Sequence, residues 1–183
     1  GGNYGIPLSE AADEEWDALI VEISSFQAEH VPSCHARVHA LLNISEDHLD
    51  RYDNFAAYAE AKGNPFENMG SDDLAVLHWG DEASERQASR GGASRVFFSE
   101  NENSGDVSPG GDDIVDRIRQ RHYPQLSLKL GGRHNLANAC ASIAVASHLG
   151  ASAAAVAQSL SSFRGLPHRY VLVAESAGVR FYD

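Results

Sequence analysis

The stretch ARVHALLNISEDHLDRYDNFAAYAEAKGNPFENMGSDDLAVLHW, residues 36–79, decides the fold class of this chain. It holds two apolar runs of strand length, Ala36–Ile44 and Leu74–Trp79, with a helical stretch between them at Asn54–Lys62. Two strands joined through a helix form a parallel unit, because the crossover returns the second strand in the direction of the first. The sequence therefore predicts an α/β fold.

The segments on either side of this stretch extend the same alternation. A short apolar run at Ala18–Ile23 predicts a further buried strand, and Arg95–Ser99 predicts another. Helices are expected between these strands, at Ser24–Glu29 and Asp81–Ser89. We therefore expect a three-layer arrangement, with a mainly parallel sheet flanked by helices.

The second half of the chain predicts antiparallel additions to that sheet. Residues 100–113 are rich in Gly, Ser, Asn and Asp, which indicates a flexible loop. Gln125–Leu130 alternates polar and apolar residues, as a half-buried strand does. Two helices are expected next, at Asn135–Leu149 and Ser152–Phe163, and the chain ends in a hairpin around residues 177–178.

The composition excludes several classes of function. Asp and Glu number 26 against 14 Lys and Arg, a formal net charge of −12, so a nucleic-acid partner is not expected. The two cysteines are too few for a disulfide framework, which favours a reducing cytoplasm. No apolar run approaches the length of a membrane span, so no membrane partner is expected either.

Polar residues follow the first predicted strand, in the stretch Val21–Gln27 (VEISSFQ). Glu22 sits in an apolar run, where a carboxylate needs a partner or a metal, and Ser24 follows at the start of a helix. Open α/β sheets bind ligands at the carboxyl ends of their strands. The alternative is a plain strand end with Ser24 as the helix N-cap. The glycines of Gly1–Gly5 (GGNYG) leave a similar choice, between a backbone anion site and a simple turn.

The second predicted strand ends in a denser polar cluster. His48 can bind a metal or a phosphate, with Asp47 and Asp50 placed to orient it. The alternative is an ordinary helix start. A zinc site at Cys34, His35 and His39 is rejected, because that spacing needs a helix where a strand is expected.

Three later features allow both a chemical and a structural interpretation. Lys62 lies near a helix C-terminus, where an exposed lysine is ordinary. Gly131–Asn135 (GGRHN) can set backbone amides against a nucleotide, or can simply begin a helix with Asn135 as its cap. Phe163–Arg169 (FRGLPHR) places two arginines in a rigid turn of a kind that often binds phosphate, or forms a plain connection.

Taken together, these motifs resemble the Mur ligase family, in matching order and spacing over nearly the whole chain. The matching segments are GGNYGIPL (1–8), VEISSFQAE (21–29), LLNISEDHLDRY (41–52), YAEAK (58–62), LGGRHNLANACASIAVA (130–146) and FRGLPHR (163–169). The SSFQ and GLPHR segments resemble the branch of the family that adds D-glutamate.

The resemblance implies an ATP- and Mg²⁺-dependent ligase that joins D-glutamate to UDP-N-acetylmuramoyl-L-alanine through an acyl phosphate. Carried over by motif, Glu22 and His48 would hold magnesium, and Lys62 would bind it as a carbamate. The remaining implied contacts are Asn3 and Ser24 with the UDP-sugar substrate, Asn135 and Asn138 with the nucleotide, and Arg169 with its γ-phosphate.

The family pattern also implies that residues 1–183 are a fragment of its central domain. The family has a G-x-x-x-x-G-K-[ST] phosphate loop upstream of GGNYG and further domains on both sides, and this sequence contains no such loop. We therefore expect the isolated chain to be inactive and, with sheet edges unpaired, to self-associate. The alternatives are a non-catalytic nucleotide-binding or association module, and a Mur-like ligase of the folyl-polyglutamate type.

Overall fold

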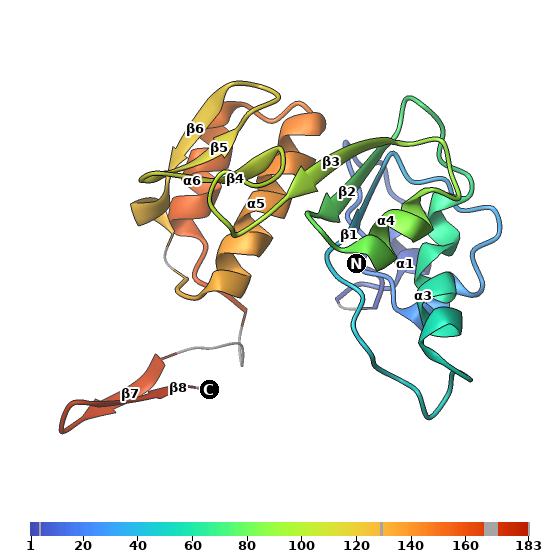
Figure 1. The fold of residues 1–183 in the computed structure, drawn as a ribbon, viewed down its shortest axis with the longest axis horizontal. Helices are drawn as coiled ribbons and strands as arrows, with labels where there is room; N and C mark the ends of the chain where they lie inside the picture. The colour runs from blue at the N-terminus through green and yellow to red at the C-terminus, as the bar shows by residue number, and fades with distance from the viewer. Residues whose placement is uncertain (4, 129, 167–171, 183) are drawn as a thin grey trace. The chain divides into compact units, whose positions relative to one another are not determined.

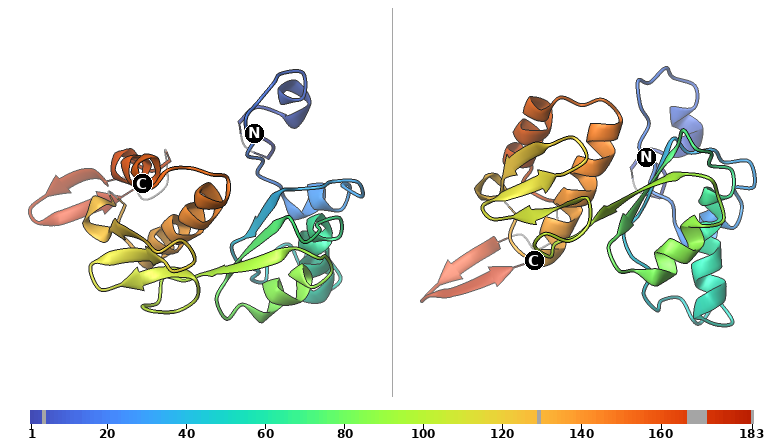
Figure 2. Two further views of the ribbon diagram at one scale, coloured as in Figure 1. Left: turned by 90° about the horizontal axis from the view of Figure 1, so that it is seen from above. Right: turned by 45° about the horizontal axis from the view of Figure 1, so that its top comes forward.

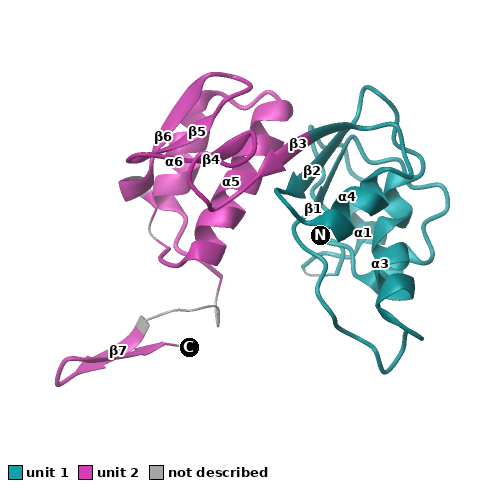
Figure 3. Ribbon diagram, viewed as in Figure 1, with its two compact units in different colours: residues 1–95 teal, residues 96–183 magenta. Residues whose placement is uncertain are grey.

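The computed structural model describes residues 1–3, 5–128, 130–166 and 172–182, which form two compact units. The first unit comprises residues 1–95 and the second residues 96–183 (Figure 3). Each unit has its own hydrophobic core and is described by itself.

A parallel strand pair forms the centre of the first unit. Strand β1 (Val38–Leu41) pairs with β2 (Leu74–His78), with Val38 opposite Leu74 and Leu41 opposite Leu77. The crossover between them contains α3 (Phe55–Gly63) and the short 3-10 helix η1 (Asn64–Phe66). The predicted strand–helix–strand unit is therefore confirmed, although both strands are shorter than expected.

Two helices pack together beside these strands. Helix α4 (Glu82–Ala88) follows β2, lies side by side with α3 and leads into β3 (Ser94–Phe98) (Figure 1). Side-chain caps explain where both helices begin, since Asn54 accepts from the Ala57 amide and Asp81 from the Ala83 amide. The predicted helices at 54–62 and 81–89 are confirmed.

The strand predicted at Ala18–Ile23 is wrong. This segment makes a single isolated bridge, between Gly2 and Glu22, and Leu19, Ile20 and Val21 remain 39%, 74% and 37% exposed. A strand requires a ladder of hydrogen bonds to a neighbour, and within the described residues only Gly1–Asn3 pairs with this segment. Around it lie two short helices, α1 (Leu8–Ala11) and α2 (Ser25–Ala28).

The antiparallel part of the sheet lies in the second unit, earlier in the chain than the sequence predicts. After β3 come β4 (Val107–Gly110), β5 (Asp113–Asp116) and β6 (Arg121–Pro124), with β3–β4 parallel and the next two pairs antiparallel. The predicted loop at 100–113 therefore has to be corrected at 107–110, which form β4, and at Asp113, where β5 begins. Val107 and Ser108 are fully buried there, although the surrounding composition is polar.

The strand predicted at Gln125–Leu130 is also wrong. The strand ends at Pro124, and Gln125–Ser127 form a 3-10 turn, η2. The Gln125 amide group donates to the carbonyls of Gly111 and Asp113, so this side chain bonds the preceding hairpin instead of a neighbouring strand. Leu126 is 91% exposed, which the alternating pattern did not predict.

Helices α5 (Arg133–His148) and α6 (Ala153–Ser162) cover one face of the β4–β6 strands (Figure 2). Gly150, with φ of +89°, ends α5: its amide bonds the Ser147 carbonyl, and the Ala151 amide bonds the Ala146 carbonyl. Ser152 then caps α6 through the Ala155 amide. Both predicted helices are confirmed.

The last described element is the expected hairpin, β7 (Leu172–Ser176) with β8 (Val179–Tyr182). The positive φ angles of Ala177 and Gly178 suit its two-residue turn. The sheet order β1-β2-β3-β4-β5-β6, parallel at first and then antiparallel, agrees with the predicted fold class. No helix in the described part of the chain is long and apolar enough to cross a membrane.

Candidate functional site

His48 lies in the segment after β1, between aromatic rings. Its ring centroid is 4.9 Å from that of Phe26 on α2 and 6.0 Å from that of Tyr58 on α3. The backbone amide of His48 donates to Oδ1 of Asp47 at 2.8 Å, and the same oxygen lies 3.7 Å from the His48 Nδ1. Asp47 therefore contacts His48 as the sequence predicted, and φ of +55° at His48 marks a backbone turn that directs the ring.

Lys62 reaches the same aromatic group from the last turn of α3. Its Nζ lies 5.3 Å from the centroid of the Tyr58 ring, one helical turn earlier. Burial lowers the pKa of Lys62, while the nearby carboxylate of Asp47 acts in the opposite direction. The structure thus brings His48 and Lys62 into contact with the same ring, that of Tyr58. Because its pKa is lowered, Lys62 loses its proton more readily than a solvated lysine does.

Asn3 and Glu22 form a second group in the same unit. The Asn3 side chain donates to Oε1 of Glu22 at 2.8 Å, and the Asn3 backbone amide donates to the Glu22 carbonyl at 2.8 Å. Both side chains are accessible to a ligand, because Asn3 and Glu22 lie at the surface. Because Glu22 is exposed, its carboxylate does not need the partner that burial in a strand would require, and its bond to Asn3 is a surface contact.

Ser24 has the structural role that was considered as its alternative. Its hydroxyl accepts from the backbone N–H of Gln27 at 3.2 Å, and the backbone N–H of Ser24 donates to the side-chain oxygen of Gln27 at 2.9 Å. These two bonds form a capping box at the start of α2. A substrate contact of Ser24 stays a prediction.

Glu29, the residue after α2, forms with Arg51 and Tyr52 a polar clamp that holds the His48 segment and has no signal in the sequence. Glu29 accepts from the hydroxyl of Tyr52 at 2.5 Å and from Arg51 at 2.8 Å, and the Arg51 guanidinium lies 4.8 Å from the Phe26 ring. The hydrogen bond from Tyr52 lowers the pKa of Glu29. The Tyr52 amide also bonds the His48 carbonyl, so this clamp fixes the turn that carries His48.

The second unit contains a pocket of about 640 Å³, a volume sufficient for a small organic ligand. Asn135 and Asn138 line it from the first turns of α5, three residues apart and so on one helix face. Its other lining residues come from the 128–130 segment, from α5 and from the end of α6: Leu128, Leu130, Ala139, Ser142, Ser159, Leu160, Ser162, Phe163 and Arg164.

Asn135 does not cap α5, so the structural alternative considered for this segment is wrong. The helix begins at Arg133, with Gly132 at the N-cap position, and the Asn135 side chain donates to the Gly131 carbonyl at 2.8 Å. Gly132 has φ of +96°, and a Cβ there would lie 2.9 Å from the His134 ring, so the turn requires glycine. The N-terminal end of this helix, with its positive dipole, borders the pocket.

Two interpretations of the sequence remain, the phosphate contact of Arg169 and the zinc site rejected at His35 and His39. Arg169 lies outside the described residues. The rejected zinc site has no support in the described part of the chain, where no three His, Cys, Asp or Glu side chains gather as a metal site. His35 instead bonds Asp73 at 2.6 Å, and the His39 ring lies edge-on to Phe66 at 4.5 Å.

The sequence pattern of the Mur ligase middle domain matches residues 5–146, most of the chain. The chain belongs to the Mur ligase family. Solved Mur ligases have the same fold: MurF from Acinetobacter baumannii superimposes with a TM-score of 0.64 at 19% identity over 84% of this chain and 34% of MurF. UDP-N-acetylmuramate-alanine ligase MurC from Thermotoga maritima gives 0.62 at 24% identity over 87% of this chain and 35% of MurC.

Curated relatives of this Mur ligase chain are named UDP-N-acetylmuramoylalanine–D-glutamate ligase. The relative from Geobacter metallireducens is 39% identical and that from Anaeromyxobacter dehalogenans 40% identical, each over 100% of this chain. The chain spans 42% of the length of each of these relatives.

The Mur ligase family implies magnesium, so the donor groups of this chain can be compared with what that ion requires. Mg²⁺ prefers oxygen ligands, which Glu22 offers as a surface carboxylate. Lys62 offers oxygens only as a carbamate, and its lowered pKa favours the neutral amine that carbamate formation needs. His48 offers a nitrogen, a weaker donor for this ion. By donor chemistry the set suits magnesium only if Lys62 is carbamylated, and no contact among the described residues joins Glu22 to His48 or Lys62.

Proposed function

We propose that this chain is part of the central, ATP-using domain of a cytoplasmic ligase that adds D-glutamate to UDP-N-acetylmuramoyl-L-alanine in peptidoglycan synthesis. The observation that carries the proposal is the identity of 39–40% over the whole chain to relatives named for that reaction. The placement of His48 and Lys62 around one ring supports it, because the family resemblance assigns both residues to the same metal site.

The reaction has two steps. The substrate carboxylate attacks the γ-phosphorus of ATP, which forms an acyl phosphate and releases ADP. The amine of D-glutamate then attacks the acyl carbon, an amide bond forms, and phosphate leaves with the bonding electrons while the amine loses its proton. Both steps bring anions together, so positioning and charge neutralisation dominate the catalysis.

Glu22, His48 and carbamylated Lys62 would hold Mg²⁺, which when bound neutralises the charge of the phosphate oxygens. The carbamate forms when the neutral Nζ of Lys62 attacks CO₂ and loses a proton. Asn3, tied to Glu22, and Ser24 would contact the UDP-sugar substrate.

The pocket beside α5 would accept the nucleotide. Its apolar lining and the amides of Asn135 and Asn138 suit the flat face and polar edge of an adenine ring. Arg169 would bind the γ-phosphate. The chain by itself is expected to be inactive, because the family's phosphate loop is not in this sequence.

An assay of ADP release by the complete enzyme tests the proposal. With UDP-N-acetylmuramoyl-L-alanine and ATP, we expect release that depends on D-glutamate and not on L-glutamate or L-alanine. Release with a folate and L-glutamate would instead identify a folyl-polyglutamate-type ligase. No release with any acceptor would favour a non-catalytic module.

A further inference from the structure

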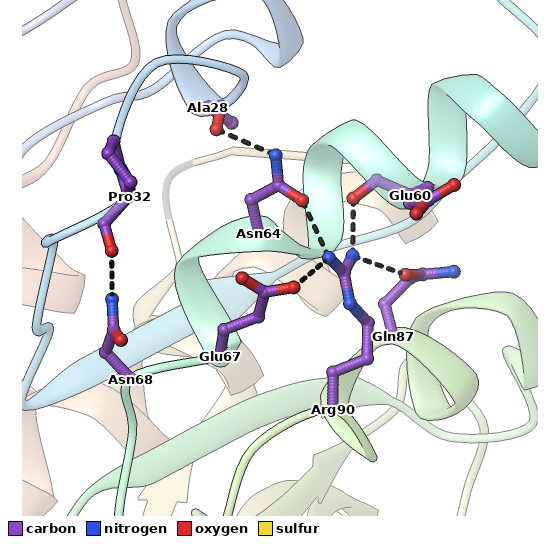
Figure 4. A network of polar contacts seen from close by, with 8 residues as sticks. All are labelled: Ala28, Pro32, Glu60, Asn64, Glu67, Asn68, Gln87 and Arg90. Atoms are coloured by element: carbon purple, nitrogen blue, oxygen red, sulfur yellow. Dashed lines mark hydrogen bonds and ion pairs between the residues drawn. The ribbon is translucent and has the colours of Figure 1, made fainter.

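Arg90, in the turn after α4, holds the end of α3 through its guanidinium group (Figure 4). Nη1 donates to the backbone carbonyl of Glu60 at 2.6 Å, and Nη2 donates to Oδ1 of Asn64 at 2.7 Å. Nη2 also lies 2.5 Å from a carboxylate oxygen of Glu67. The Arg90 side chain is only 23% exposed, a setting in which charge-assisted hydrogen bonds are strong. Arg90 is therefore hydrogen-bonded to the chain on both sides of Lys62, at Glu60 and at Asn64.

The bond to Glu60 compensates for one that the helix does not make. In a continuing helix, the backbone N–H of Asn64 would donate to the Glu60 carbonyl, but here it donates to the Ala61 carbonyl. The Arg90 guanidinium supplies the donor to Glu60 in its place. Arg90 thus caps the last turn of α3, the turn that carries Lys62.

Asn64 extends this contact to α2. Its Nδ2 donates to the carbonyl of Ala28 at 3.1 Å (Figure 4). A guanidinium can only donate and a carbonyl can only accept, so these two neighbours fix the orientation of the Asn64 amide. Ala28 is the last residue of α2, the helix that begins just after Glu22. The hydrogen bonds from Arg90 to Asn64 and from Asn64 to Ala28 therefore join the turn after α4, the end of α3 and α2.

Gly63 makes the close approach possible. A Cβ at this position would lie 2.7 Å from Nη1 of Arg90 and 2.8 Å from Cβ of Gln87. Gln87 itself accepts from Nη1 at 3.0 Å, so any side chain at position 63 would displace the guanidinium or its partner. Gly63, the residue after Lys62, therefore has a packing role.

We propose that Arg90 is a positioning residue for Lys62. By fixing the last turn of α3 against α2 and α4, it holds the Lys62 amine beside the Tyr58 ring, which His48 also contacts, and the carbamate would form there. Arg90 acts through the backbone of α3 and touches neither substrate nor metal. This inference rests on the proposed function, in which Lys62 carries the carbamate.

The test measures the carbamate directly. The complete ligase is equilibrated with ¹³C-bicarbonate, and the carbamate carbon is observed by ¹³C NMR in the wild type, Arg90→Met and Arg90→Lys. Lys62→Ala identifies the signal. Arg86→Met is the matched control, because Arg86 is an exposed arginine on α4, the helix that precedes Arg90. Thermal unfolding reports whether each variant is folded, and kcat is measured alongside.

We expect the carbamate signal and kcat to fall at least about fivefold in Arg90→Met. Arg90→Lys keeps the charge but not the forked geometry, so its loss should be similar, and it decides the matter if Arg90→Met does not fold. An undiminished carbamate signal in folded Arg90 variants would overturn the proposal, even if kcat fell. If the wild-type spectrum shows no carbamate signal that is lost in Lys62→Ala, Lys62 does not carry a carbamate. That outcome would refute both the role of Lys62 and this inference.

Discussion

The ammonium group of Lys62 lies 5.3 Å from the centroid of the Tyr58 ring, one turn away on the same helix. Helix α3 continues to Gly63, so Lys62 is in its last turn and the following Asn64-Pro65 does not remove it from the helix. The cation is held on an aromatic face in a half-buried place where its pKa is lowered. Burial favours the neutral amine that reacts with CO₂, whereas the aromatic face and the Asp47 carboxylate favour the cation.

The first prediction concerns Lys62→Ala in the complete enzyme. We expect turnover to fall by roughly 10–100-fold, as it does when a metal site loses a supporting group. Acetate or formate should restore part of it, by taking the place of the carbamate oxygens. The wild type with the same additives is the control. Full activity of Lys62→Ala without an additive would contradict the role of this lysine.

The second prediction is a pH dependence of stability caused by His39. Burial, together with the nearby Lys62, lowers the pKa of His39 to about 4, from 6.5. Between these values the unfolded chain binds a proton that the folded chain does not. The folded state is therefore fully favoured above pH 6.5 and loses about 3 kcal/mol as the pH falls to 4, from ~1.4 kcal/mol per pKa unit.

His39→Leu should remove this dependence. Its Nε2 is buried without a hydrogen-bond partner among the described residues, so an apolar side chain of similar size should be tolerated at pH 7. Urea unfolding at several pH values from 4 to 7.5 measures the effect, as the difference from wild type. Surface His30→Gln is the control. Parallel pH profiles for His39→Leu and the wild type would show that His39 is not the cause.

The sequence predicted the parts of the fold that depend on local patterns. β1, β2, α3, α4, α5 and α6 follow from apolar runs, caps and Gly150. The errors have a different origin. Ala18–Ile23 has a strand-like composition, but strand formation depends on a hydrogen-bonded neighbour, which composition does not specify. Val107 and Ser108 are buried by contacts with distant segments, inside a polar stretch.

The candidate site shows the same division. His48, Lys62 and Asn138 were found by motif, and the structure places the first two around Tyr58. The Arg90 contacts could not be predicted, because Arg90 and Asn64 are 26 residues apart and meet only through the packing of α3 on α4. An isolated arginine after a helix gives no sequence signal of its own.

The third prediction concerns the proposed metal residues. Glu22→Ala and His48→Ala in the complete enzyme should each lower turnover by roughly 10–100-fold. Stability should change little, because Glu22 is exposed and His48 is partly exposed. Matched controls are Glu14→Ala and His30→Ala, exposed residues of the same types in the same unit. Steady-state assays over a range of Mg²⁺ decide the matter, and near-normal turnover of both variants at low Mg²⁺ would exclude the assignment.

The last prediction is that the chain self-associates. Leu19, Ile20 and Val21 are exposed in a row, and pairing of this segment within the described residues is limited to Gly1–Asn3. Unpaired extended backbone with apolar side chains favours pairing with a second chain. The net charge of −12 opposes it, so the measurement belongs at about 0.15 M salt, where surface repulsion is screened beyond ~8 Å.

Light scattering over a dilution series should therefore give a mass of a dimer or larger at micromolar concentration. Ile20→Asp is the informative variant, because Ile20 is 74% exposed and its replacement should weaken association without disturbing the core. Leu126→Asp provides the control, since Leu126 is 91% exposed in the other unit. A mass of 19.7 kDa at every concentration would show that mutual repulsion prevails and that the exposed segment stays unpaired.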